Sequence, residues 1–161
     1  MTDRTILAID PSNTRHAWVV MDNSYHIYGF GRDLLKERSP VVDMATEIWI
    51  EMIASYGMPV GREVFETCLN IGELSVNHPD AHLITRQQAK LAICYSARAN
   101  DSNIRTALID LFGGAAQTKK GGKLYGIAGD CWAALAIAVA VCKENITPYR
   151  RARDTEDKCK I

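Results

Sequence analysis

Short apolar runs separated by turn residues dominate the beginning of the chain. Such runs predict strands at 5–9, 17–21 and 25–30, where branched and aromatic residues gather. Asp10-Pro11-Ser12-Asn13 ends the first run, and Asp22-Asn23-Ser24 separates the second run from the third. Because the connections are so short, the three strands are expected to form an antiparallel meander.

The pattern then changes to helical spacing. Ser39-Pro40 is typical of a helix N-cap followed by proline at the first helical position. Apolar residues recur every three or four positions over 41–56, which predicts an amphipathic helix that ends at the glycines of 57–61. Two further short apolar runs predict a fourth strand at 63–68 and a fifth at 82–85.

The second half of the sequence is predicted to be helical. One helix is expected over 86–97, and a second after the capping residues of 100–102, ending at Gly113-Gly114. The segment 115–129 is rich in glycine and lysine and is expected to be a loop. Asp130 then begins an alanine-rich helix that reaches about Lys143 and is apolar nearly all round, so it should be buried.

This order of elements favours an α/β fold. Strands in a meander followed by helices predict a central mixed five-stranded sheet flanked by helices. With 161 residues, 47% of them apolar, the chain suits one domain over 1–161 with a substantial core. A charged tail is expected after about residue 148.

The overall charge does not identify a partner. The chain has 19 basic and 19 acidic residues, whereas a protein that binds nucleic acid often has a basic excess. Local clusters remain: Lys119, Lys120 and Lys123 in the loop, and Arg150, Arg151 and Arg153 in the tail. The plainer interpretation of each cluster is an ordinary solvated surface.

The cysteines and the apolar runs indicate a compartment. Five cysteines without a CxxC pair argue against a disulfide framework or a zinc site, so reduced thiols are expected. The N-terminus lacks a signal-peptide pattern, and the longest apolar run, Cys131 to Cys142, is too short to span a bilayer. We therefore expect a cytoplasmic protein, of a bacterium or a phage-infected host cell, with no membrane partner.

Three acidic residues occupy positions in which a charge needs a partner. Asp10 closes the first predicted strand, Glu66 lies in the fourth, and Asp130 opens the buried helix. Carboxylate oxygens suit the hard cation Mg²⁺, and two such ions can hold the attacking and leaving oxygens of a phosphodiester. Singly, each residue has a plainer interpretation: a turn residue for Asp10, a solvent-facing edge residue for Glu66, and a helix N-cap for Asp130.

Taken together, these positions resemble the RuvC family of Holliday-junction resolvases, within the RNase H-like superfamily. The stretches that carry the resemblance are Ile6–Ser12, Val64–Glu66, Thr85–Lys90 and Asp130–Ala138. The resemblance implies an RNase H-like fold and a Mg²⁺-dependent endodeoxyribonuclease that resolves four-way DNA junctions by two-metal phosphodiester hydrolysis, as a homodimer. Asp10, Glu66 and Asp130 would be the catalytic metal ligands, and Mn²⁺ would substitute for Mg²⁺.

The resemblance also implies where DNA would bind. The residues expected to contact it are Ser12, Asn13, Arg86, Lys90, Lys119, Lys120 and Lys123. Contacts of this kind position a duplex on the protein without reading its sequence.

Two departures from the family pattern stand out. Ala133 takes the place of a second aspartate, which would lie on the same helix face as Asp130. Either strong catalysis has been lost, or the chain carries a deliberate inactivating change. The link from Cys68 to Ala81 has room for only one or two helical turns where the family has a longer helix, which argues against the family's dimer interface.

Two other classes of protein fit part of the pattern. A branched-DNA-binding protein of the same fold, without cleavage activity, is favoured by Ala133. An actin-like ATPase also ends its first strand in an aspartate followed by small polar residues. That fold needs two domains and a second glycine-rich phosphate loop, however, and Gly113-Gly114 has no following strand to complete one.

Overall fold

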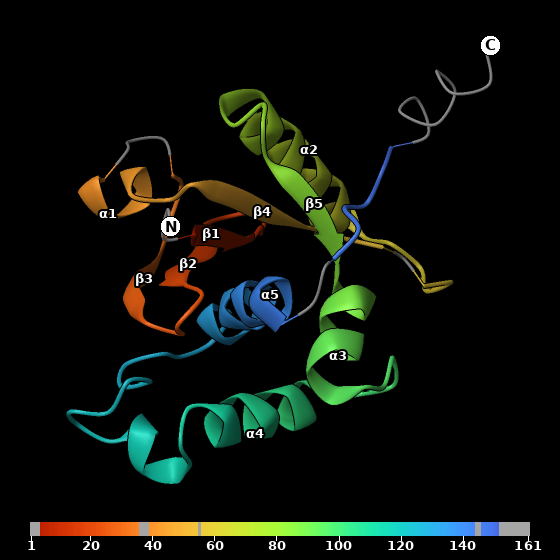
Figure 1. Ribbon diagram of the computed structural model, residues 1–161. Helices are drawn as coiled ribbons and strands as arrows, with labels where there is room; N and C mark the ends of the chain where they lie inside the picture. The colour runs from red at the N-terminus through yellow and green to blue at the C-terminus, as the bar shows by residue number, and fades with distance from the viewer. Residues whose placement is uncertain (1–3, 36–38, 55, 144–145, 152–161) are drawn as a thin grey trace, which may run out of the picture.

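The sheet of the computed structural model has five strands in the order β3-β2-β1-β4-β5 (Figure 1). The structure describes residues 4–35, 39–54, 56–143 and 146–151. The predicted meander is confirmed: β1 (Thr5–Asp10), β2 (His16–Asp22) and β3 (Ile27–Asp33) are antiparallel neighbours. The predicted α/β class, with a mixed sheet flanked by helices, is confirmed as well.

The helix predicted over 41–56 is wrong. Only one turn, α1 (Pro40–Asp43), follows the cap, where the Ser39 hydroxyl accepts a hydrogen bond from the Val42 amide. The chain then becomes the strand β4 (Glu47–Met52).

Pairing with the rest of the sheet explains this strand. The amide and the hydroxyl of Thr46 both donate to the Thr5 carbonyl, at 2.8 and 3.1 Å, and align β4 with β1. β4 lies parallel to β1 on one side and to β5 (His82–Thr85) on the other. A strand buried on both faces shows no alternation of apolar and polar residues, so its sequence pattern does not separate it from a helix.

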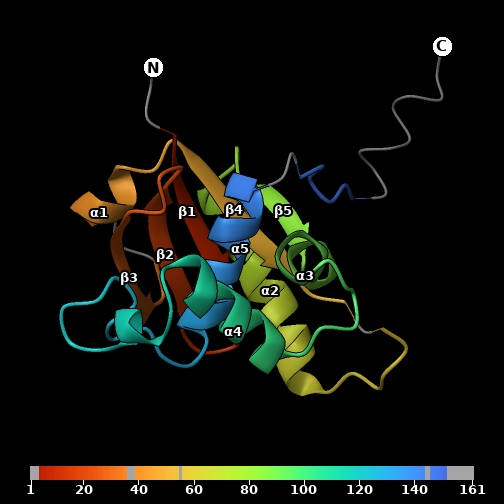
Figure 2. The same cartoon turned by 60° about the horizontal axis from the view of Figure 1, so that its bottom comes forward.

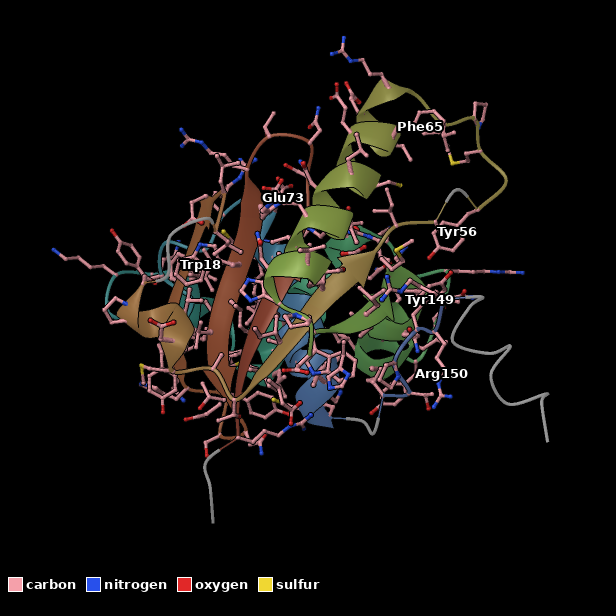
Figure 3. The ribbon with its side chains drawn as sticks, turned by 90° about the horizontal axis from the view of Figure 1, so that it is seen from above. Trp18, Tyr56, Phe65, Glu73, Tyr149 and Arg150 are labelled. Carbon is pink, nitrogen blue, oxygen red and sulfur yellow. The ribbon has the colours of Figure 1, made fainter. Side chains whose placement is uncertain are left out.

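The fourth strand predicted at 63–68 is also wrong. These residues belong to α2 (Arg62–Asn77), a helix of 16 residues that lies on one face of the sheet (Figure 3). The buried positions, spaced as on one helix face, are Thr67, Ile71 and Leu74. The length of α2 corrects the expectation that only one or two helical turns fit between Cys68 and Ala81.

The predicted C-terminal helices are confirmed with small changes at their ends. They are α3 (Arg86–Cys94), α4 (Asp101–Leu111) and α5 (Cys131–Lys143). The segment between α4 and α5 holds a single 3₁₀ turn, η1 (Ala115–Thr118). As expected, nearly every residue of α5 is buried.

The sheet separates two apolar cores. One contains α5, α3 and α4, and it receives Ile6, Ala8 and Trp49 from the strands. The other contains α1 and α2, and it receives Leu7 and Ile9 from β1. Figures 1 and 2 show α2 on one side of the sheet and α5, with α3 and α4 outside it, on the other. Alternation along β1 therefore decides which core, and which helices, each side chain meets.

Four cysteines, Cys68, Cys94, Cys131 and Cys142, are free thiols, as expected. Cys159 and Arg153 lie outside the described residues. Within the described part of the chain, no helix combines the length and the apolar character needed to cross a bilayer.

Candidate catalytic site

Two carboxyl groups meet at the ends of neighbouring parallel strands. Ile9 of β1 pairs with Ile50 of β4, so Asp10 and Glu51 follow side by side. Ile9 and Ile50 belong to the α2 core, and alternation turns Asp10 and Glu51 to the opposite face, toward α5. The two carboxyls lie close enough for each to perturb the pKa of the other.

Burial makes this pair unusual. Glu51 is only 4% exposed, although it carries an ionisable group. Desolvation, together with the neighbouring charge of Glu51, raises the pKa of Asp10 to about 8. Burial also raises the pKa of Glu51, against the opposing charge of Arg86. Two carboxyls this close do not both ionise readily, so in the absence of a cation they hold a proton between them.

Arg86 is the cation beside the pair. It is the first residue of α3, and a capping box between Thr85 and Gln88 fixes the turn from which it projects. Its Nη1 lies 3.4 Å from Glu51 Oε1, and its Nη2 donates to Asp101 Oδ1 at 2.8 Å. Burial alone would lower the pKa of Arg86, but the charges of Glu51 and Asp101 raise it above its usual value. The guanidinium is therefore permanently charged.

Asp130 stands where α5 begins, one helical turn before Ala133. Its main-chain carbonyl accepts hydrogen bonds from the Ala133 and Ala134 amides, at 2.9 and 3.2 Å. Its carboxylate pairs with Arg32 of β3 at 3.1 Å, and both side chains are about half exposed. Asp130 is close enough to raise the pKa of Asp10 further, yet its own charge is engaged by an arginine.

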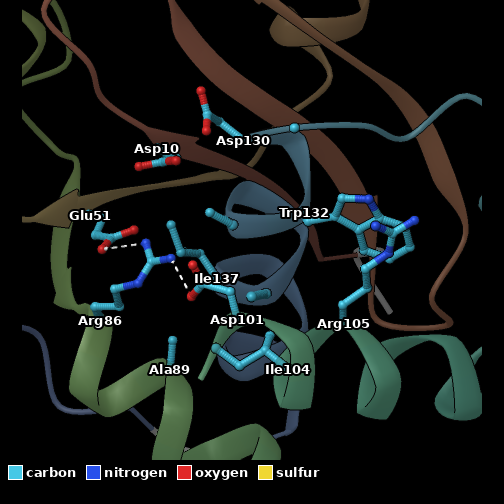
Figure 4. Close-up of a pocket in the computed structure, with 13 residues that line it drawn as sticks. Asp10, Glu51, Arg86, Ala89, Asp101, Ile104, Arg105, Asp130, Trp132 and Ile137 are labelled. Carbon is cyan, nitrogen blue, oxygen red and sulfur yellow. Dashed lines mark hydrogen bonds and ion pairs between the residues drawn. The ribbon is translucent and has the colours of Figure 1, made fainter. Parts of the chain in front are cut away.

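These residues line one cavity of about 130 Å³ between the sheet, α3, α4 and α5 (Figure 4). Its lining includes Asp10, Glu51, Arg86, Asp101, Asp130 and Ala133. Among the residues that the structure describes, no three Asp, Glu, His or Cys side chains form a ready-made metal site. The Asp10–Glu51 pair nevertheless fits one hard cation, because Mg²⁺ commonly uses one or two carboxylates and keeps several waters.

Glu66 is not brought to this cavity. It lies on α2, which packs against the other face of the sheet, and its carboxylate accepts from Arg62 Nε at 2.6 Å and Asn13 Nδ2 at 3.3 Å. The expectation that Glu66 sits on a strand beside Asp10 is wrong, and Glu51 occupies that place. The sequence does contain a signal for Glu51, because it is an acidic residue inside the apolar run 48–53. In an amphipathic helix over 41–56, Glu51 would instead lie on the polar surface.

The residues expected to contact DNA divide into three groups by their position in the fold. Ser12 and Asn13 make internal bonds: the Ser12 hydroxyl donates to the Arg15 carbonyl, and the Ser12 carbonyl accepts from Asn70. Arg86 faces the cavity, and Lys90 lines a second hollow to which Arg86 also contributes. Contacts of these residues with DNA stay predictions.

The three loop lysines are exposed on a segment with its own hydrogen bonds. The Leu124 amide donates to the Gln117 carbonyl at 2.9 Å, and the buried Leu124 side chain anchors the loop. A side chain at Gly122 would collide with the Gln117 backbone, so this corner needs glycine. The lysines do not line the cavity, but the loop leads directly into Asp130.

The fold has close counterparts among solved structures. Among solved structures, Thermus thermophilus RuvC in complex with a Holliday junction substrate matches with a TM-score of 0.56 and 12% identity, covering 87% of this chain and 93% of that one. A second Thermus thermophilus RuvC structure matches with a TM-score of 0.55 and 13% identity, over 84% and 92%. No family model and no curated protein sequence matches the chain. The likeness thus establishes a shared fold, that of RuvC.

The raised pKa of Asp10 predicts how stability depends on pH. A carboxyl whose folded pKa exceeds its unfolded value stabilises the protein at low pH, and this contribution is lost as pH rises through the folded pKa. Metal-free protein should therefore lose stability between about pH 4 and about pH 8, the interval set by the ordinary and the folded pKa of Asp10. A tenfold change in proton affinity on folding corresponds to about 1.36 kcal/mol, which makes the loss measurable by chemical denaturation.

The variant Asp10→Asn removes the titrating group, so its unfolding free energy should vary much less over the same interval. Glu66→Gln, away from the cavity, should keep the wild-type slope. Equal slopes for the wild type and Asp10→Asn would contradict a buried, proton-sharing pair.

Proposed function

We propose that the chain is a structure-selective endonuclease that binds four-way DNA junctions and hydrolyses their backbone with Mg²⁺, or with Mn²⁺ in its place. The observation that carries the proposal is the Asp10–Glu51 pair, with Asp10 half-buried and Glu51 buried, side by side at the carboxyl ends of two parallel strands. Burying two acids is costly unless something positive joins them. A fold shared with a junction-bound RuvC supports DNA as the partner.

Asp10 and Glu51 would hold the cation, which would replace their shared proton. Asp130 would join them once its carboxylate leaves Arg32. The bound cation would supply an acidified water and neutralise charge on the scissile phosphate. Hydrolysis in this way leaves a 5′-phosphate and a 3′-hydroxyl.

The basic residues around the cavity would position the strands. Arg86 lies within the cavity, and Lys119, Lys120 and Lys123 extend the positive charge along the loop that leads to Asp130. Phosphate contacts of this kind supply affinity and register without sequence recognition.

A second candidate, a junction-binding protein that does not cut, is favoured by one feature. Ala133 lines the cavity where the family pattern has an acid, and the Asp130 carboxylate is paired with Arg32. Fewer carboxylates weaken the attraction for cations. Catalysis by this chain is therefore expected to be slow.

We further propose a homodimer formed through α2. Three apolar residues, defined here as the α2 stripe, project from its outer face: Phe65, Leu69 and Val76, which are 61%, 74% and 79% exposed. They lie four and seven residues apart, so they share one side of the helix. A junction needs two symmetric cuts, and a two-fold dimer that buries one helix from each copy provides two symmetric sites.

The first test compares two glutamates. Glu51→Gln keeps the shape of the side chain but removes a proposed ligand, so Mg²⁺-dependent cleavage of a synthetic four-way junction should fall by about 100-fold or more, at or beyond the usual effect of losing a supporting partner. Glu66→Gln should change the rate only a few-fold. Both variants should bind the junction in Ca²⁺. The reverse ranking would move the site to α2 and contradict the proposal.

The second test restores an acid. In Ala133→Asp, a carboxylate one turn from Asp130 should strengthen cation binding and raise Mg²⁺-dependent cleavage by about 10–100-fold. The added charge should also destabilise the protein in metal-free buffer, because like charges this close repel. If Ala133→Asp binds the junction yet cuts no faster than the wild type, position 133 is not a missing ligand, and the non-cutting candidate is preferred.

The third test concerns the dimer. Leu69→Glu places a charge in the middle of the α2 stripe and should shift the protein from dimer to monomer in sedimentation experiments. Leu111→Glu, an equally drastic change at an exposed leucine on α4, is the matched control and should leave the dimer intact. A wild-type protein that sediments as a monomer at micromolar concentration would contradict the α2 dimer.

A further inference from the structure

Two arginines line the cavity, Arg86 and Arg105; Arg105 stacks over the Trp132 ring, whereas Arg86 contacts the acids. Its guanidinium lies between Glu51 and Asp101 and faces the cavity (Figure 4). One N–H group is directed to each of these two acids. A guanidinium carries five such donors in a fixed plane, so several remain for another acceptor.

The cavity as it stands is rich in negative charge. Asp10, Glu51, Asp101 and Asp130 all line it, and a DNA strand entering it would add a phosphate. Hydrolysis joins a water oxygen to phosphorus and breaks the bond to the 3′-oxygen, which takes up a proton. Negative charge grows on the phosphate oxygens along the way, and a fixed cation stabilises that charge without having to be recruited.

Ala133 makes this fixed charge more important. It lines the same cavity as Arg86, and it offers no oxygen to attract a second metal ion. An arginine stays protonated and can present two parallel N–H groups to a phosphate. We propose that Arg86 is a catalytic residue, which contacts the scissile phosphate and supplies the positive charge that a carboxylate at position 133 would otherwise recruit as a metal ion. This inference rests on the proposed nuclease function.

A purely structural role for Arg86 makes different predictions. As a brace, it would only neutralise Glu51 and connect β4 to the beginnings of α3 and α4. Its removal would then disturb Glu51 and weaken cation binding. As a catalytic cation, it repels a metal ion at the Asp10–Glu51 pair, so its removal should leave cation affinity unchanged or raise it.

The experiment is a double-mutant cycle between positions 86 and 133. It uses the full chain as the wild type, Arg86→Gln, Ala133→Asp and the double variant, with Arg98→Gln as the matched control at an exposed arginine between α3 and α4. Three quantities are measured: the cleavage rate of a four-way junction in Mg²⁺, junction affinity in Ca²⁺, and Mn²⁺ affinity by calorimetry.

Arg86→Gln is expected to slow cleavage by about 100-fold in the Ala133 protein, the effect of removing one fixed charge-stabilising donor. In the Ala133→Asp protein, the same change should cost less than about 10-fold, because the cycle measures how far the two positions replace each other. Mn²⁺ affinity should not fall in Arg86→Gln, and Arg98→Gln should behave as the wild type does.

Equal losses in both backgrounds, or a loss of Mn²⁺ affinity in Arg86→Gln, would overturn the catalytic role and leave Arg86 as a brace. Equal cleavage rates for the wild type and Arg86→Gln would also overturn the catalytic role of Arg86, but would leave the nuclease function supported. If neither the wild type nor Ala133→Asp cleaves in Mg²⁺ or Mn²⁺, the nuclease function itself fails.

Discussion

The burial of two carboxyl groups side by side is the constraint to which the rest of the site responds. Asp10 and Glu51 are neighbours because β1 and β4 run parallel in register, and alternation turns both toward α5. Such a pair would be costly as two charges in an apolar setting. In this molecule the Arg86 guanidinium beside Glu51 offsets part of the cost, and the raised pKa of Asp10 favours its protonated form. The same two carboxyls are therefore prepared for a cation, which can displace the proton without any rearrangement of the strands.

The scaffold brings the remaining groups to this pair through the beginnings of three helices. Arg86 opens α3, Asp101 opens α4, and Asp130 directly precedes α5. Capping boxes fix the first two of these turns, and the deeply buried α5 fixes the third. Helix N-termini carry partial positive charge, which favours carboxylates and also an incoming phosphate. A rigid apolar core on both sides of the sheet thus holds a polar site at one end, where small changes of charge alter the chemistry without disturbing the packing.

Much of the fold was predictable, because turn chemistry and burial leave clear local patterns. The meander, the edge strand before Arg86 and the buried α5 follow directly from their sequences. The wrong helix over 41–56 and the wrong strand at 63–68 are related. Because β4 is buried on both faces, its apolar residues fit helical spacing as well, and Glu51 is predicted to lie on a helix. With β4 predicted as a helix, Glu51 has no place beside Asp10, and Glu66 is assigned to a strand that the structure replaces with α2. Its helix follows a glycine that caps through its backbone alone, so no side-chain signal marked the start. Asp10 and Asp130 each adjoin an element that the sequence predicts, and both line the cavity. The contact of Arg86 with Glu51 joins residues 35 positions apart and leaves no local trace in the sequence.

Whether a protein of this fold cleaves a junction or only binds it depends on how negative charge is compensated in one cavity. A further carboxylate beside Asp130 would add repulsion to this cavity that a bound metal ion would relieve. Here Ala133 adds no such acid, Arg32 pairs with Asp130 and Arg86 pairs with Glu51, so the protein's own side chains offset part of the negative charge that lines the cavity. Because of this compensation, the site should bind cations more weakly, but Arg86 is already positioned to contact a phosphate. Arg86 and Arg32 are paired with Glu51 and Asp130, which are also the acids that a cation would bind. A cation bound to either acid would release a guanidinium for the DNA phosphate, and a phosphate bound to the guanidinium would release a carboxylate for the cation. Metal and DNA should therefore bind cooperatively.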